Sequence, residues 1–440
     1  MILLAGCTAA PVPAEPLPTW EFPAVDFVGD RPKNLLMISI DTLRRDHLDR
    51  YATDGIERMP FLSSLFAEGV ALDDHQQCGN WTFQSTSCTL IGRPNEDLGW
   101  FAKLNGDGPT PVPDGQETIA ARLGEVGFRT MLVSANPWLS SQWNNAQGYQ
   151  ERPRVSGLDA ASLAHGALIS LGKNIALEPT DHWMLHVHFT EPHTTYSPPE
   201  AYRDEVNALP PIPYDLDDHD THYDVVDDEW PAMTPELQAL VTRHLRARYD
   251  AEVRYLDDQL AVVWDELDRD GWLDDTLVVI WTDHGEQFWE HGHQTHAWGL
   301  AAEETDGLLL LWARDIVPRA WGAPTASVDL LPTLLDVFGL PPDETLPGFA
   351  LGQAPDHRAR FTAASAREGT LAAVTRDGMK LTWWFDGRAS LVDRNVDRQE
   401  QVELYDPARP EVAELWALLA PQVDALSAAV PEVELVLPSW

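Results

Sequence analysis

The chain has 440 residues, 44% of them hydrophobic, and so can bury a core large enough for one big α/β domain with a smaller appendage. Its formal net charge of -40 excludes the electrostatic footprint of a nucleic-acid-binding protein, because a phosphate backbone would be repelled over most of the surface. A small anionic substrate would be repelled as well, so a pocket for one must supply its own cations. The acidity agrees equally with high solubility or a saline habitat.

The N-terminal segment is typical of a bacterial lipoprotein. An apolar stretch and the tripeptide Leu-Ala-Gly precede Cys7, which would be lipidated after cleavage. Because a basic n-region is missing, we expect the gene to start further upstream. Residues 1–33 are therefore predicted to be a signal remnant and a Pro-rich tether. We expect an exported protein, periplasmic or at the outer membrane or cell surface, whose membrane attachment is the lipid on Cys7.

Apolar runs of strand length alternate with segments of helical spacing between residues 34 and 345. The strand-like runs are 34–40, 130–135, 183–189, 276–281 and 307–312, and the helical segments are 60–68, 117–125, 160–171, about 234–268 and 328–338. This alternation predicts a catalytic domain of the α/β class, with a large, mainly parallel sheet sandwiched by helices.

Two further regions depart from this pattern. Residues 197–230 are rich in Pro, Asp and His without periodicity, which predicts a long surface excursion near the rim of a site. Beyond residue 345, short strand patterns at 372–375 and 379–384 and a helical segment near 411–419 predict a small α+β subdomain over residues 346–440 with an antiparallel sheet.

Polar residues that directly follow the strand-like runs are the first candidates for a site, because ligands of parallel sheets collect beyond the carboxyl ends of the strands. Asp41 follows the first run, His193 lies just beyond the third, and Asp283 and His284 follow the fourth. Thr82 opens a predicted helix, where free N–H groups and the helix dipole favour an anion.

Each of these residues has a structural alternative. Asp41 could cap a helix, and Thr82 could be an N-cap without any chemistry. His193 and His296 taken singly could be surface or core histidines. Two Asp, one His and one Thr at neighbouring strand ends would nevertheless form a ligand set for a divalent cation, with further histidines available for proton transfer.

Eight stretches of the sequence carry a family resemblance. They are residues 34–46, 81–93, 188–196, 249–255, 282–286, 290–296, 328–334 and 404–407. In their order along the chain they resemble the sulfatase family of the alkaline phosphatase superfamily, over about residues 34 to 419. The resemblance implies the alkaline-phosphatase-like fold, a large sheet between layers of helices.

The resemblance also implies roles for individual residues. Asp41, Asp283 and His284 match the metal ligands of the family, and Thr82 stands at the position of the nucleophile, whose oxygen would be a further metal ligand. This implies one divalent metal. A single imidazole among oxygen ligands suits zinc or manganese better than calcium.

The same resemblance gives roles to four more residues, of which the two arginines are the weaker candidates. His193 matches a histidine near the leaving group of the substrate, and His296 falls where many members place a Lys or His beside the transferred group. Arg44 and Arg93 are candidates for substrate binding, although Arg93 could instead brace the end of the nucleophile helix.

The chain departs from the family at the nucleophile. Sulfatases carry Cys or Ser in a Cys/Ser-x-Pro-Ser-Arg signature and convert it to formylglycine, whereas this chain has Thr82, Gln84 and Thr86 at the first, third and fifth positions. We therefore expect no formylglycine. Cys88 fails the signature too, and Cys78 and Cys88 could form a disulfide or stay as buried thiols. A Thr nucleophile resembles instead the phosphodiesterases, phosphoethanolamine transferases and lipoteichoic-acid synthases of the superfamily.

These patterns predict a metal-dependent hydrolase of sulfate or phosphate mono- or diesters that works through a covalent Thr82 intermediate and favours phosphate. The substrate would be an anionic ester of a small molecule, a glycan or a lipid headgroup. A phosphoethanolamine- or phosphoglycerol-type transferase and a catalytically inactive cell-surface binding protein remain open alternatives.

Overall fold

The computed structural model describes residues 25–98, 110–152, 159–177, 182–367 and 369–429. Cys7 and most of the predicted tether lie outside the described residues, as do the last eleven residues of the chain. None of the helices in the described part is both long enough and apolar enough to cross a membrane.

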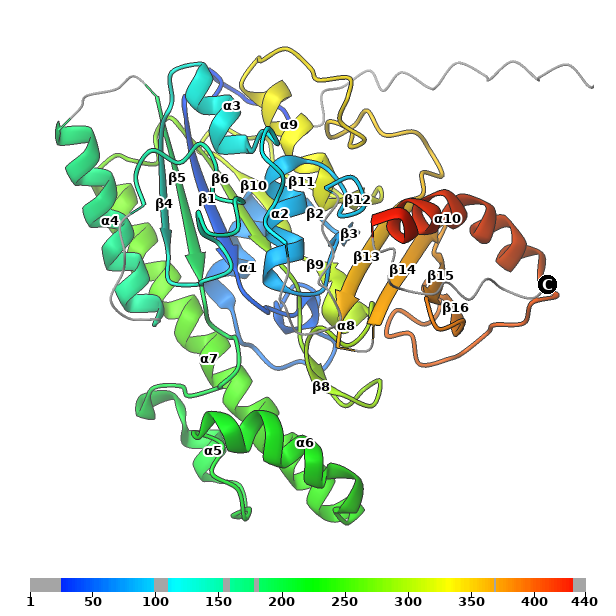
Figure 1. The fold of residues 1–440 in the computed structure, drawn as a ribbon. Coiled ribbons are helices and arrows are strands. Elements are labelled where there is room, and N and C mark those ends of the chain that lie inside the picture. Colours follow the sequence, from blue (N-terminus) through cyan, green and yellow to red (C-terminus); the bar gives the residue numbers. More distant parts are fainter. Residues whose placement is uncertain (1–24, 99–109, 153–158, 178–181, 368, 430–440) are drawn as a thin grey trace, which may run out of the picture.

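A seven-stranded sheet forms the centre of the molecule (Figure 1). Its order is β11 (Arg319–Trp321), β2 (Val70–Leu72), β10 (Leu309–Trp312), β6 (Thr276–Thr282), β1 (Asn34–Ile40), β5 (Trp183–Phe189) and β4 (Arg129–Ser134). The four strands from β6 to β4 are parallel, whereas β10 is antiparallel to both of its neighbours. The predicted mainly parallel sheet is therefore confirmed, with one reversed strand.

Helices cover both faces of this sheet, because successive side chains of a strand point to opposite sides. Leu36, Ile38 and Ile40 of β1 pack in the core on the side of α1 (Pro60–Glu68), α4 (Ala160–Leu177) and α7 (Pro235–Arg269). Leu35 and Met37 pack on the other side, under α2 (Thr82–Ile91), α3 (Ile119–Glu125) and α9 (Leu330–Val337). The α/β sandwich is as predicted.

The predicted excursion, residues 197–230, lies shortly before the long helix α7 in the chain. The N-cap of this helix, Thr234, accepts a hydrogen bond from Leu237 N at 3.3 Å, and Pro235 occupies the first helical position. Residues 197–230 are not devoid of regular structure, since they contain the short helices α5 (Asp204–Asn207) and α6 (Val226–Glu229). Figure 1 shows both helices beside the N-terminal part of α7, away from the sheet. Elements this short leave no periodicity to detect in a sequence.

Small β elements surround the carboxyl edge of the sheet. A three-stranded sheet has the order β12 (Thr325–Ala326), β3 (His75–Gln76) and β9 (Asp306–Gly307), and a ribbon pairs β7 (Gln287–Phe288) with β8 (Gln294–Thr295). The single turn α8 (Ala302–Thr305) immediately precedes β9.

The C-terminal part contains the antiparallel sheet that was predicted. It consists of β13 (Arg360–Ala366), β14 (Gly369–Arg376), β15 (Met379–Trp384) and β16 (Ala389–Asp393) and is covered by α10 (Pro410–Ala429). Asn95 Nδ2 donates to Cys78 O at 3.0 Å and to Ala363 O at 3.1 Å, which joins β13 to the chain just before α2. Cys78 forms a disulfide with Cys88, the first of the two alternatives. The domain boundaries after residues 33 and 345 stay predictions.

Candidate active site

Three of the four predicted metal ligands, Asp41, Asp283 and His284, meet at the carboxyl edge of the sheet. Asp41 follows β1 and Asp283 follows β6, and these strands are parallel neighbours with Ile40 opposite Thr282. All three side chains are fully buried. His284 Nε2 lies 3.4 Å from Asp41 Oδ1 and 3.7 Å from Asp283 Oδ2. Atoms bound to one metal at about 2.1 Å are roughly 3–3.5 Å apart, so this spacing suits a shared ion.

The hydrogen bonds around these ligands leave one atom of each without a partner. Asp283 Oδ1 accepts from Thr42 N and His284 N, and Asp41 Oδ2 accepts from Asn136 Nδ2. His284 Nδ1 donates to Gly285 O at 3.0 Å, which places its lone pair on Nε2. Within the described part of the chain, Asp41 Oδ1, Asp283 Oδ2 and His284 Nε2 are buried without a hydrogen bond. Buried polar atoms normally have partners, and a divalent cation would satisfy all three.

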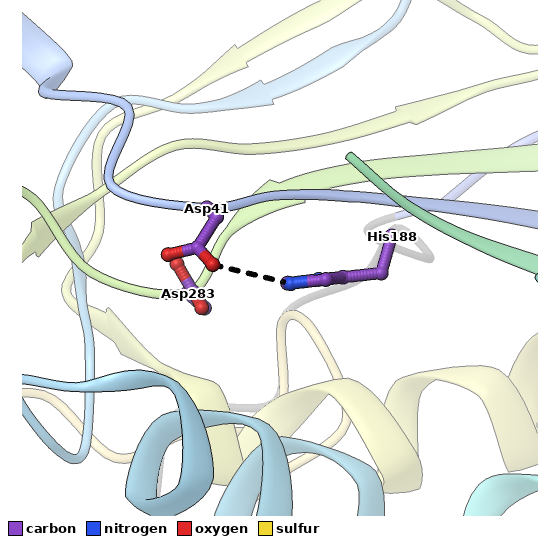
Figure 2. A group of neighbouring side chains, drawn as sticks. All are labelled: Asp41, His188 and Asp283. Atoms are coloured by element: carbon purple, nitrogen blue, oxygen red, sulfur yellow. Dashed lines mark ion pairs between the residues drawn. The ribbon is translucent and has the colours of Figure 1, made fainter. Parts of the chain in front are cut away.

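His188, which was not predicted as a site residue, reaches the same point from β5. Figure 2 shows its imidazole directed at the carboxylates of Asp41 and Asp283, with Nε2 at 3.4 Å from Asp41 Oδ2. One ligand atom from each of these three residues lies within 4.8 Å of the others. The signal was present, because His186 and His188 alternate within an otherwise apolar strand. Burial lowers the pKa of His186 to about 3, so this ring is neutral.

Thr82 is the first residue of α2, after Trp81 as N-cap. Trp81 makes no side-chain capping hydrogen bond, and the start of a helix favours an anion. Asn136 lies next to Thr82 and was also missed. Its Nδ2 donates to Asp41 Oδ2 at 2.7 Å and lies 3.5 Å from Thr82 Oγ1. Asn136 follows the strand predicted at 130–135 by one residue, the criterion that identified Asp41.

The two predicted catalytic histidines stand beside this cluster. The rings of His193 and His296 are 5.0 Å apart, and the ring of His296 is 4.4 Å from that of His284. His296 Nδ1 lies 2.5 Å from Glu286 Oε1, while the other oxygen of Glu286 accepts from the hydroxyls of Thr194 and Tyr196. Glu286 thus orients His296.

The surroundings of these histidines shift their pKa values in opposite directions. Burial, together with the neighbouring His284 and His193, lowers the pKa of His296 well below its usual value. Burial acts in the same sense on His193, but the negative charges of Asp41 and Glu286 outweigh it and raise the pKa of His193.

Both arginines form structural contacts. Arg44 is buried and binds Asp46 at 2.7 Å, Glu290 at 2.6 Å and Glu286 O at 3.1 Å. Arg93 donates to the backbone oxygen and the hydroxyl of Thr345. Among the described residues, the hydrogen bonds of neither guanidinium reach Thr82, so their substrate-binding role stays a prediction.

Comparisons with known proteins agree with the fold and the motifs. The family model named Sulfatase matches residues 33–340. A choline-sulfatase of Rhizobium meliloti (strain 1021) is 28% identical over 201 residues, which are 43% of this chain and only 38% of that protein. The phosphonate monoester hydrolase of Silicibacter pomeroyi is 21% identical, with a TM-score of 0.69 over 90% of this chain and 95% of that chain. A protein solved with its substrate D-glucosamine-2-N,6-O-disulfate is 16% identical, with a TM-score of 0.69 over 91% of this chain and 99% of that chain. The two structural likenesses establish the fold, and the family match extends over most of the chain: this protein belongs to the sulfatase family.

Proposed function

We propose that the protein is a metal-dependent hydrolase of phosphate or sulfate esters and that Thr82 is its nucleophile. The observation that carries this proposal is the set of three buried, unpaired ligand atoms beside a threonine at the uncapped start of α2. The names of the relatives support it, since they describe hydrolases of a sulfate ester and of phosphonate monoesters.

Asp41, Asp283 and His284 would hold the metal together with the Thr82 oxygen, and zinc or manganese suits this set better than calcium. A divalent metal bound there would lower the pKa of the Thr82 hydroxyl and screen the negative charge of the substrate. Oxygen atoms of the substrate would receive hydrogen bonds from the first N–H groups of α2.

Thr82 Oγ1 would form a bond to phosphorus or sulfur while the bond to the ester oxygen breaks. The leaving oxygen would take a proton from His193 or from His296. Water would then hydrolyse the Thr82 ester and release the product. The substrate would be an anionic ester of a small molecule, a glycan or a lipid headgroup, which the chain would meet at a membrane if Cys7 carries a lipid.

The test is a turnover assay of the metal-loaded protein on matched aryl phosphodiester, phosphomonoester, phosphonate and sulfate substrates. We expect multiple turnovers on at least one of them, and loss of this activity in Thr82→Ala and in Asp283→Ala. Metal analysis should find about one equivalent in wild type and less in Asp283→Ala. A metal-loaded protein that turns over none of the substrates would contradict the proposal and favour a binding protein.

A further inference from the structure

A chain of hydrogen bonds leads from His188 into the core. His188 Nδ1 lies 2.8 Å from Ser39 Oγ, Ser39 Oγ lies 2.8 Å from His186 Nε2, and His186 Nδ1 lies 2.8 Å from the Tyr149 hydroxyl. All four side chains are buried. The register of β1 and β5 pairs Ser39 with His188, and His186 lies two residues earlier on the same face of β5.

The protons of this chain can be arranged in two directions, because a neutral imidazole has one donor and one acceptor nitrogen. In the first direction, Tyr149 donates to His186, and the proton of His188 ends on Nε2, opposite Asp41 Oδ2. That contact is 3.4 Å long, and Nε2 has no hydrogen-bond partner among the described residues. At this length a proton on Nε2 would make only a long ion pair with Asp41, beyond the roughly 2.7–3.2 Å of an ordinary N–H···O hydrogen bond.

In the second direction, His188 Nδ1 donates to Ser39, Ser39 donates to His186 Nε2, and His186 Nδ1 donates to the Tyr149 oxygen. The lone pair of His188 Nε2 then faces the carboxylates of Asp41 and Asp283, as Figure 2 shows for the ring itself. A buried lone pair beside two carboxylates is unfavourable without a cation that all three share.

We propose that His188 is a metal ligand in this chain, in addition to Asp41, Asp283 and His284, and that Ser39, His186 and Tyr149 hold its proton on Nδ1. This inference rests on the proposed function, because it needs that site to bind a metal. Two imidazole nitrogens and two carboxylate oxygens make a ligand set suited to zinc and related transition metals, and unsuited to calcium or magnesium.

The three residues behind His188 are positioning residues. A metal-binding histidine usually donates its second N–H to an acceptor that fixes its tautomer and orientation. Here the acceptor is Ser39, which in this direction gives its own hydroxyl proton to a bare His186 Nε2. The Tyr149 hydroxyl secures that tautomer of His186 by accepting from Nδ1. A tyrosine remote from the metal thereby contributes to metal affinity.

The direct test counts imidazole ligands by X-ray absorption spectroscopy of the protein loaded with Zn²⁺. We expect two imidazoles in wild type, one in His188→Gln, one in His284→Gln and two in the control His186→Gln. The glutamine amide can replace an Nε2–H donor to Asp41, so a merely donating His188 would be rescued by it. One imidazole in wild type, or two in His188→Gln, would overturn the inference while leaving the proposed function intact. A wild type that binds no Zn²⁺ would overturn both.

The second arm measures the dissociation constant of Zn²⁺ by competition with a chelator. Tyr149→Phe and Ser39→Ala should weaken binding by about 10–100-fold while keeping two imidazoles. The control Tyr202→Phe removes a hydroxyl that binds Asp258 at the surface and should leave the constant unchanged. Unchanged Zn²⁺ affinity in both Tyr149→Phe and Ser39→Ala would overturn the positioning role of the chain.

Discussion

The buried carboxylate of Glu304 accepts a hydrogen bond from Asn80 Nδ2 at 3.0 Å. It also accepts from the backbone N–H groups of Ala297 at 2.9 Å and Gly299 at 3.1 Å. Asn80 lies two residues before Thr82, and Ala297 directly follows His296. One side chain therefore joins the segment that carries Thr82, the proposed nucleophile, to the segment that carries His296.

Glu304→Gln should impair catalysis without removing the metal. The side chain of Glu304 is surrounded by hydrogen-bond donors, and the NH₂ group of a glutamine would face one or more of them. Part of the hydrogen bonds from Asn80, Ala297 and Gly299 would therefore be lost. We expect kcat to fall at least 10-fold and the free energy of unfolding to fall by about 1–3 kcal/mol. Steady-state kinetics, urea unfolding and metal analysis check this. Glu303→Gln is the matched control, because Glu303 binds His291 instead. Equal losses of kcat in the two variants would contradict the joining role of Glu304.

Asn136→Ala removes the only amide found between Asp41 and the Thr82 hydroxyl among the described residues. Outer partners of metal ligands typically contribute about 10–100-fold to activity or metal affinity, and we expect a loss of that size in kcat/KM. Gln142→Ala, an exposed position in the same loop, should behave as wild type. A fully active, fully metallated Asn136→Ala would show that the amide has no part in the reaction.

Asp257 gives a prediction for the dependence of stability on pH. Burial raises the pKa of Asp257 to about 6, although its carboxylate accepts from Leu62 N and Phe61 N at the start of α1. The folded state therefore holds this proton more tightly than the unfolded state, whose pKa is near 3.8. The stability due to this group is full below pH 3.8 and falls as the pH rises to 6, by about 3 kcal/mol at most.

Asp257→Asn removes that term and keeps an oxygen as acceptor. The free energy of unfolding of the variant minus that of wild type should therefore increase as the pH rises from 4 to 7. Urea unfolding in metal-free buffer measures this difference. Asp258→Asn, at the exposed neighbouring position, should show no such gain. A difference that decreases as the pH rises over the same interval would contradict the predicted sign.

The site residues that were predicted follow local sequence patterns, whereas the role of a residue that was not predicted depends on how the strands pair. β1 and β5 match the predicted runs to the residue, because a buried parallel strand is mostly apolar and is followed by polar residues. Asp41 and Asp283 follow such ends and were found. The role of His188 depends on β5 lying beside β1, and that pairing is non-local.

Local sequence patterns also did not predict the direction of strand β10 or the length of helix α10. An apolar run such as that of β10 has the same composition whether the strand is parallel or antiparallel to its neighbours. Helix α10 continues to Ala429, ten residues past its predicted end, although Pro421 lies inside it. A proline inside a helix usually indicates a break. Packing of Val423 and Leu426 against the small sheet stabilises the added turns.

The chemistry of Thr82 predicts which esters the protein hydrolyses faster. Formylglycine hydrate has a second hydroxyl, which lets a sulfated intermediate break down by eliminating sulfate without attack of water on sulfur. Thr82 has no such hydroxyl, so its sulfate ester must be discharged by direct attack at sulfur. A phosphothreonine carries more negative charge beside the N–H groups of α2, and electrostatic stabilisation of that kind provides most of the catalysis in phosphoryl transfer.

Phosphate esters should therefore turn over repeatedly, while sulfate esters react slowly or once for each protein molecule. Steady-state and single-turnover rates on matched aryl phosphodiester, phosphomonoester and sulfate substrates measure this preference. Thr82→Ser keeps a hydroxyl and should keep the preference, whereas Thr82→Ala should lose both activities because no oxygen remains at the start of α2. Mass spectrometry of a quenched reaction should find the added group on the peptide that contains Thr82. Sustained sulfate turnover above phosphate turnover would contradict the argument from the missing hydroxyl, and full activity of Thr82→Ala would place the nucleophile elsewhere.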